Sequence, residues 1–82
     1  MSRVVYSVLS TSGNPDIFTH SSEKFSVVIQ REREKDEYLP TYEMSMKIYG
    51  DDRSTFLSEK RHNIRSARQR VEKLLEIFNI SN

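Results

Sequence analysis

Apolar and polar side chains alternate strictly from residue 42 to residue 48. The apolar positions, which would share one side of an extended chain, are Tyr42, Met44, Met46 and Ile48. Because successive side chains of a β-strand point to opposite faces, this pattern predicts a strand with one face toward the core and the other toward solvent. Gly50, Asp51 and Asp52 follow it and are typical of a turn.

A second segment with the same period precedes this strand. Phe25, Val27 and Ile29 would share one side of an extended chain, which leads into the charged residues 31–37. We expect the two segments to form an antiparallel hairpin with the charged residues as its connection. Nearer the N-terminus, residues 4–9 predict a strand covered on both faces, residues 10–16 a loop, and residues 17–19 a short edge strand.

The C-terminal third has helical periodicity. Its apolar residues recur at steps of three and four, and they are Ile64, Ala67, Val71, Leu74, Leu75 and Phe78. They form one stripe on a helical wheel, which predicts an amphipathic helix packed on the sheet. Asn79 suits the exit of this helix because asparagine accepts the left-handed backbone conformation found there.

Two starting points for this helix remain open. It could begin at Asn63, with residues 54–61 as a further short strand, or near Ser54, as a much longer helix. Basic side chains such as Lys60 and Arg61 are unfavourable at the positive N-terminal end of a helix dipole. An earlier start would place them in the middle of the helix, so the sequence favours the longer form.

Together these elements predict one α+β domain over residues 1–82. Its antiparallel sheet would have three or four strands and would be packed on one face by a long C-terminal amphipathic helix. The 82 residues include no cysteine, which excludes disulfides and thiolate metal sites as sources of stability. A domain of this size gains stability from a partner or from a second copy, so a homodimer is one expectation.

No continuous apolar stretch is long enough to be a signal peptide or to span a membrane. The absence of cysteine agrees with a reducing compartment. We therefore expect a cytoplasmic protein that does not act on membranes.

Residues that could carry out catalysis are scarce. The two glycines lie far apart, so no phosphate-binding loop is present. A hydrolytic centre would have to use His20 or His62. His20 follows a loop sequence, and His62 lies among Lys60, Arg61 and Arg65 with no adjoining carboxylate to orient its ring. We expect no enzymatic activity, no cofactor and no metal site.

Positive charge is concentrated toward the C-terminus. Residues 53–73 include seven basic and two acidic side chains. If the helix were long, Arg61, Arg65 and Arg68 would lie within one arc beside the apolar stripe, close to Lys60. Such an arc could bind phosphates, an acidic protein surface or only solvent, because Glu72 and Glu76 continue the same face.

Two further groups are candidates for partner binding. Arg31 and Arg33 belong to the charged connection, where alternating signs suit a protein partner better than nucleic acid. Tyr49 and Val28 are harder to bury under a single helix. They predict that the far side of the sheet is covered by a partner or by a second copy.

The order of three strands followed by a helix, with Ser66, Ala67 and Arg68 opening an amphipathic turn, resembles double-stranded-RNA-binding domains. The segment from Phe25 to Ile29, ahead of a charged turn, is similar to the first hairpin of HicB-type antitoxins. The sequence lacks the first helix and glycine-rich turn of the former, and the acidic, Pro/Gly-punctuated middle of the latter. We assign it to neither family.

From these patterns we expect a small non-enzymatic regulatory or inhibitor-type protein that docks on a macromolecule, with a protein favoured as the partner. Phages and mobile elements often encode compact, charge-polarised proteins of this kind. The alternative is a nucleic-acid-binding module that uses the basic helix around Arg61, Arg65 and Arg68.

Overall fold

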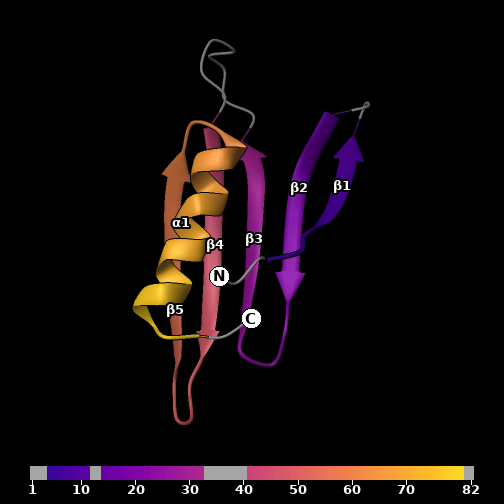
Figure 1. Cartoon of the computed structure of the whole chain (residues 1–82). Coiled ribbons are helices and arrows are strands. Elements are labelled where there is room, and N and C mark those ends of the chain that lie inside the picture. Colours follow the sequence, from indigo (N-terminus) through magenta and orange to yellow (C-terminus); the bar gives the residue numbers. More distant parts are fainter. Residues whose placement is uncertain (1–3, 12–13, 33–40, 81–82) are drawn as a thin grey trace.

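Five strands and one helix follow one another along the chain (Figure 1). The computed structural model describes residues 4–11, 14–32 and 41–80. Its elements are β1 (Ser7–Thr11), β2 (Asn14–Ser21), β3 (Phe25–Glu32), β4 (Thr41–Tyr49), β5 (Ser54–Arg61) and α1 (Ile64–Ile77). The strands form one antiparallel sheet in the order β1-β2-β3-β4-β5. The α+β class is confirmed.

The centre of the sheet is the pair formed by β3 and β4, whose alternation was visible in the sequence. Val27 lies opposite Met46 and Ile29 lies opposite Met44, and all four side chains are fully buried. Phe25, at the start of β3, is buried with them. The expected antiparallel pairing is therefore confirmed, although Arg31 and Glu32 belong to β3 and the rest of the charged connection lies outside the described residues. The inward side chains of β3 and β4 make up most of the sheet's share of the core.

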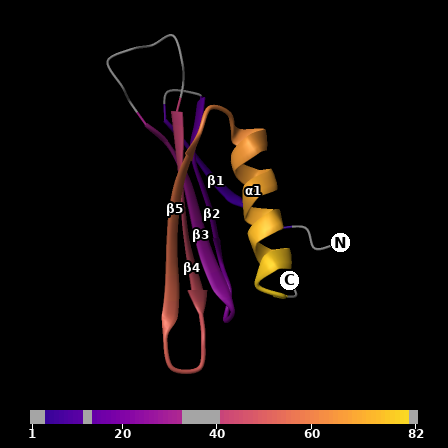
Figure 2. The same ribbon diagram turned by 90° about the vertical axis from the view of Figure 1, so that its left-hand side faces the viewer.

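Helix α1 covers one side of the sheet and packs on β3, β4 and β5 (Figure 2). The residues that it buries are Ala67, Val71, Leu74 and Leu75. These are four of the six residues in the predicted stripe. Ile64 is half-buried, whereas Phe78 is exposed because it caps the helix and lies beyond the last turn that faces the sheet.

The prediction of a long helix from near Ser54 is wrong, and so is the prediction of three or four strands. Residues 54–61 form β5, which gives five strands, and α1 has only 14 residues. Leu57 lies opposite Met46 on the side of the helix, while Phe56 lies opposite Lys47 on the other side. Leu57 packs against the core as part of this strand. Burial of an apolar side chain stabilises the fold by more than a better placement of Lys60 and Arg61 in a helix dipole would.

The start of α1 is determined by Asn63. Its backbone is extended, with φ −145° and ψ 160°, and its side-chain Oδ1 accepts a hydrogen bond of 2.7 Å from the Ser66 N–H. This is the geometry of an N-cap, which satisfies one of the amide groups left free in the first helical turn.

The end of α1 is determined by Asn79, as predicted. Asn79 has φ 56° and its N–H donates to the Glu76 carbonyl, while the Ile80 N–H donates to the Leu75 carbonyl. This pair of hydrogen bonds is the Schellman arrangement, which needs a left-handed residue after the cap. Ile80 then packs against the core, so the exit also contributes apolar contact.

The N-terminal region differs from the prediction in three ways. The strand expected over residues 4–9 begins at Ser7, and Val8 and Leu9 are exposed, so it is not covered on both faces. Residues 17–19 belong to β2, which lies inside the sheet between β1 and β3. Most of the loop expected over residues 10–16 is strand, because β1 and β2 extend to Thr11 and from Asn14.

The Asn63 cap can be tested by substitution. We expect Asn63→Ala to lower the free energy of unfolding by about 1 kcal/mol, because a first-turn amide loses its partner. Urea denaturation would measure the change. Asn63→Asp is the control and should retain most of the stability. Equal stability of the alanine variant and the wild type would contradict a helix that begins at Ile64.

Candidate docking surfaces

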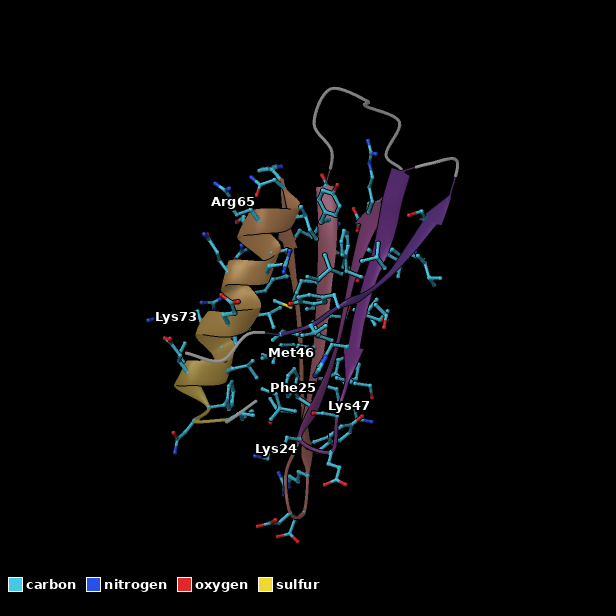
Figure 3. The ribbon with its side chains drawn as sticks, turned by 45° about the vertical axis from the view of Figure 1, so that its right-hand side comes forward. Lys24, Phe25, Met46, Lys47, Arg65 and Lys73 are labelled. Carbon is cyan, nitrogen blue, oxygen red and sulfur yellow. The ribbon has the colours of Figure 1, made fainter. Side chains whose placement is uncertain are left out.

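Successive side chains of each strand point to opposite sides, so the sheet has two faces. Phe25 and Met46 point toward α1, whereas Lys47 points to the opposite side (Figure 3). Within the described residues no helix covers that opposite side. We call it the open face, and it consists of the side chains in phase with Val28 in β3, Ser45 in β4 and Ser58 in β5.

The open face exposes large apolar side chains. Phe56 is 70% exposed, Leu9 61%, Tyr49 40% and Val28 39%. Lys47 lies between two of them: it is opposite Phe56 across the strands, and its Nζ is 5.5 Å from the centroid of the Tyr49 ring. Phe56 and Tyr49 thus lie together beside Lys47, whereas Leu9 lies on the opposite edge strand, β1. Contiguous apolar surface rimmed by polar groups marks interaction sites.

The middle of the open face is made of small side chains. One row crosses all five strands at the level of Ser45, and its members are Ser7, Thr19, Val28, Ser45 and Ser58. Four of these five residues are serine or threonine. A row without bulky side chains allows another surface to approach the sheet closely.

The described part of the open face has equal numbers of positive and negative side chains. Its charged side chains within the described residues are Glu32, Glu43, Lys47 and Lys60, two of each sign. Lys60 Nζ lies 3.3 Å from Glu32 Oε1, and the Ser58 hydroxyl donates to Glu43 Oε1 at 3.5 Å. A surface with no net charge does not attract a polyanion such as nucleic acid.

The helix side has a different character, centred on Glu59. Arg61 Nη2 donates to Glu59 Oε1 at 2.9 Å, and Arg70 Nε donates to Glu59 Oε2 at 2.9 Å. Partial burial opposes the charge of Glu59, but the hydrogen bonds from Arg70 and Arg61 outweigh it and hold the pKa of the Glu59 carboxyl below its ordinary value. This carboxylate therefore joins β5 to α1.

The predicted arc of Arg61, Arg65 and Arg68 on one helix is wrong, because Arg61 is the last residue of β5 and is paired with Glu59. Arg65 and Arg68 do lie on α1, and both are exposed. The turn at residues 62–63 breaks the regular 3.6-residue spacing on which the arc depended.

Arg68 is held by the segment that precedes β1. Its Cζ lies 5.1 Å from the centroid of the Tyr6 ring, and the Tyr6 ring meets Phe18 edge to face at 6.4 Å. Burial raises the pKa of Tyr6 to about 12, an effect that the positive charge of Arg68 reduces in part. Arg68 thus has a packing role as well as an exposed charge.

The remaining predicted binding residues lie in different places. Lys60 and Tyr49 are on the open face. Arg31 is exposed at the end of β3, opposite Tyr42 and in phase with the helix side. Arg33 lies outside the described residues. The six candidates that the structure describes therefore do not form one surface.

The two histidines can be compared directly. His20 Nδ1 lies 2.9 Å from the Val5 carbonyl oxygen, which only accepts, so Nδ1 must carry the hydrogen. The ring stacks on Phe25 at 4.9 Å, and Nε2 is buried with no partner among the described residues. His20 therefore secures the segment before β1. His62 is exposed in the turn before α1.

Phe56, Leu9, Lys47 and Glu43 belong to the open face but were not among the predicted binding residues. Periodicity could not identify Phe56, because Phe56 and Leu57 are adjacent and either could face the core. The hydroxyl residues that alternate around them, Ser54 and Ser58, are the one sequence signal that a face of β5 stays in water.

Comparison with protein-family models, with curated proteins and with solved structures gives no match. Within residues 4–11, 14–32 and 41–80, no three histidine, aspartate or glutamate side chains are grouped so that they could hold a metal ion. None of the helices in this part of the chain has the length and apolar character needed to cross a membrane.

The role of Glu59 predicts a pH dependence of stability. Its folded-state pKa is lowered, so its stabilisation is present above an unfolded-state pKa of 4.5 and is lost as the pH falls through the lower, folded-state pKa. We expect Glu59→Gln to be less stable than the wild type at pH 7 and equally stable well below pH 4.5. Urea denaturation across this range would measure it.

Glu76→Gln is the matched control, because the exposed Glu76 carboxylate makes one long ion pair among the described residues, with Lys73 at 3.8 Å. We expect this variant to differ little from the wild type at any pH. A destabilisation by Glu59→Gln that persists unchanged into acid would contradict the ionic role of Glu59.

Proposed function

We propose that this chain is a small non-enzymatic binding protein, of regulatory or inhibitor type, which docks on a protein partner through the open face of its sheet. The observation that carries the proposal is the exposure of Phe56, at 70%, on a face that no helix within the described chain covers. Aromatic side chains surrounded by polar groups are typical of the centres of protein interfaces.

The chemistry of the open face favours protein over nucleic acid as the partner. Its lysines and glutamates are equal in number among the described residues, so it offers no field that would concentrate phosphates. Its hydroxyl-rich middle is flat, which suits another flat surface such as a sheet. We infer a partner whose docking surface is flat and made of small side chains at the centre, with one group of each charge opposite Glu43 and Lys47.

The proposal requires no cofactor, and it places the protein in the cytoplasm, in keeping with a chain that has no cysteine. It gives His20 a packing role, which is supported by the hydrogen bond from one ring nitrogen to the Val5 carbonyl and by the burial of the other.

Site-specific photo-crosslinking tests the docking surface. A photoreactive phenylalanine analogue placed at Phe56 should form covalent adducts with protein in cells that express the chain naturally. The same group at Gln69, on the exposed side of α1, is the matched control and should form few. Adducts at Phe56 should decrease at least about tenfold when Val28→Glu is added, because a carboxylate would be placed within the interface.

Two results would contradict the proposal. One is crosslinking at Gln69 alone, and the other is crosslinking at Phe56 that Val28→Glu leaves unchanged. Thermal melts of each variant would establish that the fold is intact, which we expect because both substituted side chains already contact water.

A second candidate function, nucleic-acid binding, is favoured by one specific observation. The first turn of α1 contains Arg65 and no acidic residue, although the positive end of the helix dipole makes arginine unfavourable there. Over its length α1 has four basic and two acidic side chains. An exposed residue that lowers helix stability can be present because binding requires it.

Arg65→Glu separates the two candidates. Because a carboxylate suits the helix N-terminus, we expect the variant to be more stable than the wild type by about 0.5 kcal/mol. If the protein bound duplex through this turn, the same change would abolish a tight and salt-sensitive interaction. Our proposal instead predicts weak binding of the wild type to nonspecific duplex at low salt, measured by fluorescence anisotropy.

Arg53→Glu, in the turn between β4 and β5, is the charge-matched control for this measurement. Tight duplex binding that Arg65→Glu abolishes and Arg53→Glu leaves intact would make nucleic-acid binding the leading function.

A further inference from the structure

The charged residues of β4 are placed symmetrically on the open face. Lys47 and Glu43 lie two residues to either side of Ser45, so each is about 7 Å from it along the strand. They have opposite charges. A rotation that reverses the direction of β4 about Ser45 therefore brings Lys47 to the position of Glu43.

Three of the twofold arrangements that would stack this face on an identical one differ in how they place these charges. If the axis ran along β4, Lys47 would face Lys47 of the second copy and Glu43 would face Glu43. If it ran along β3, strand β4 would lie over β2 of the second copy. Lys47 would then face Ser21 of that copy, and Glu43 would face its Ile17. The first arrangement sets like charges together, and the second leaves buried charges without partners.

The third axis crosses the strands at the level of Ser45. Each strand then lies over the same strand of the second copy and runs in the opposite direction. Lys47 faces Glu43 of the second copy, and this pair occurs twice. We propose that the protein partner of the open face is a second copy of this chain, bound about this axis. The inference rests on the proposed function and names its partner.

Other contacts agree with this axis. The small row through Ser45 and Ser58 lies on the axis, where two sheets approach most closely. Phe56, in the row of Lys47, faces Lys60 of the second copy, in the row of Glu43. The Lys60 ammonium group can stay with Glu32 at 3.3 Å while its methylene chain covers the Phe56 ring.

Sheet geometry allows the charge pairs to form. Stacked sheets cross at about 30° and lie about 10 Å apart. Lys47 lies about 7 Å from the axis, so this crossing angle shifts it sideways from Glu43 of the second copy by about 4 Å. A lysine side chain spans that distance. Five strands of about eight residues offer about 600 Å² per copy, and both copies together reach the lower end of standard interfaces.

Sedimentation velocity with charge variants tests this arrangement. We expect the wild type to be a dimer in the micromolar range. Lys47→Glu alone and Glu43→Lys alone should each weaken the dimer at least about tenfold, because each places like charges opposite each other twice. A 1:1 mixture of the two variants should form heterodimers with close to wild-type affinity, since every pair across the axis then has opposite signs.

Lys73→Glu, on the exposed side of α1, makes the same change in net charge as Lys47→Glu and should leave the dimer unchanged. A second measurement does not depend on charge. The chain has no cysteine, so Ser45→Cys introduces one thiol, which should join two copies through a short bismaleimide. Gln69→Cys should not.

The outcomes separate this inference from the docking proposal. A wild type that stays monomeric, while Phe56 crosslinks a different protein, would overturn the second copy as partner and leave the docking surface in place. A dimer that the charge variants do not weaken, or variants that fail to pair when mixed, would overturn the axis. A monomer with no crosslinks at Phe56 would overturn both.

Discussion

The width of a single helix limits what this domain can bury. An α-helix with its side chains is about 10 Å across, whereas five strands at about 4.8 Å spacing are about 24 Å wide. Helix α1 therefore packs on β3, β4 and β5 and does not reach β1 and β2. Among the described residues, α1 therefore leaves one whole face of the sheet and part of the other uncovered.

On the helix side, the segment before β1 covers the part of the sheet that α1 does not reach. Val4 enters the core, and the Tyr6 ring lies between Phe18 of β2 and Arg68 of α1. His20 holds this segment through the Val5 carbonyl. A few residues of irregular chain thus replace a second helix, which explains how a domain with one helix can retain a five-stranded sheet.

On the other side, nothing in the described chain performs that role. The open face compensates in part by its composition, because serine and threonine on β2, β4 and β5 tolerate water. Phe56 and Leu9 do not fit this explanation. The charges follow the same division: Arg61 and Arg70 bind Glu59, Arg65 and Arg68 lie on α1, and the open face has two charged side chains of each sign among the described residues. The helix side thus supplies the cohesion of the fold, and the open face is the side that our docking proposal concerns.

Much of the architecture could be read from local patterns. The alternation in β3 and β4 and the stripe from Ala67 to Leu75 identified the core residues, because burial imposes a period of two or 3.6 on any sequence that folds this way. Asn79 predicted the helix exit, since few residues adopt its conformation. What the sequence determined by itself was which segments have an apolar side.

The tertiary structure decided how those sides are used. Residues 54–61 suit a strand or a helix locally, and only the space beside β4, where Leu57 meets the core, selects the strand. That selection moves Arg61 away from Arg65 and places Phe56 in water, so it rearranges the candidate site as well as the fold. Strand phase and neighbouring strands are long-range properties, and a short apolar run does not specify them without the surface it packs against.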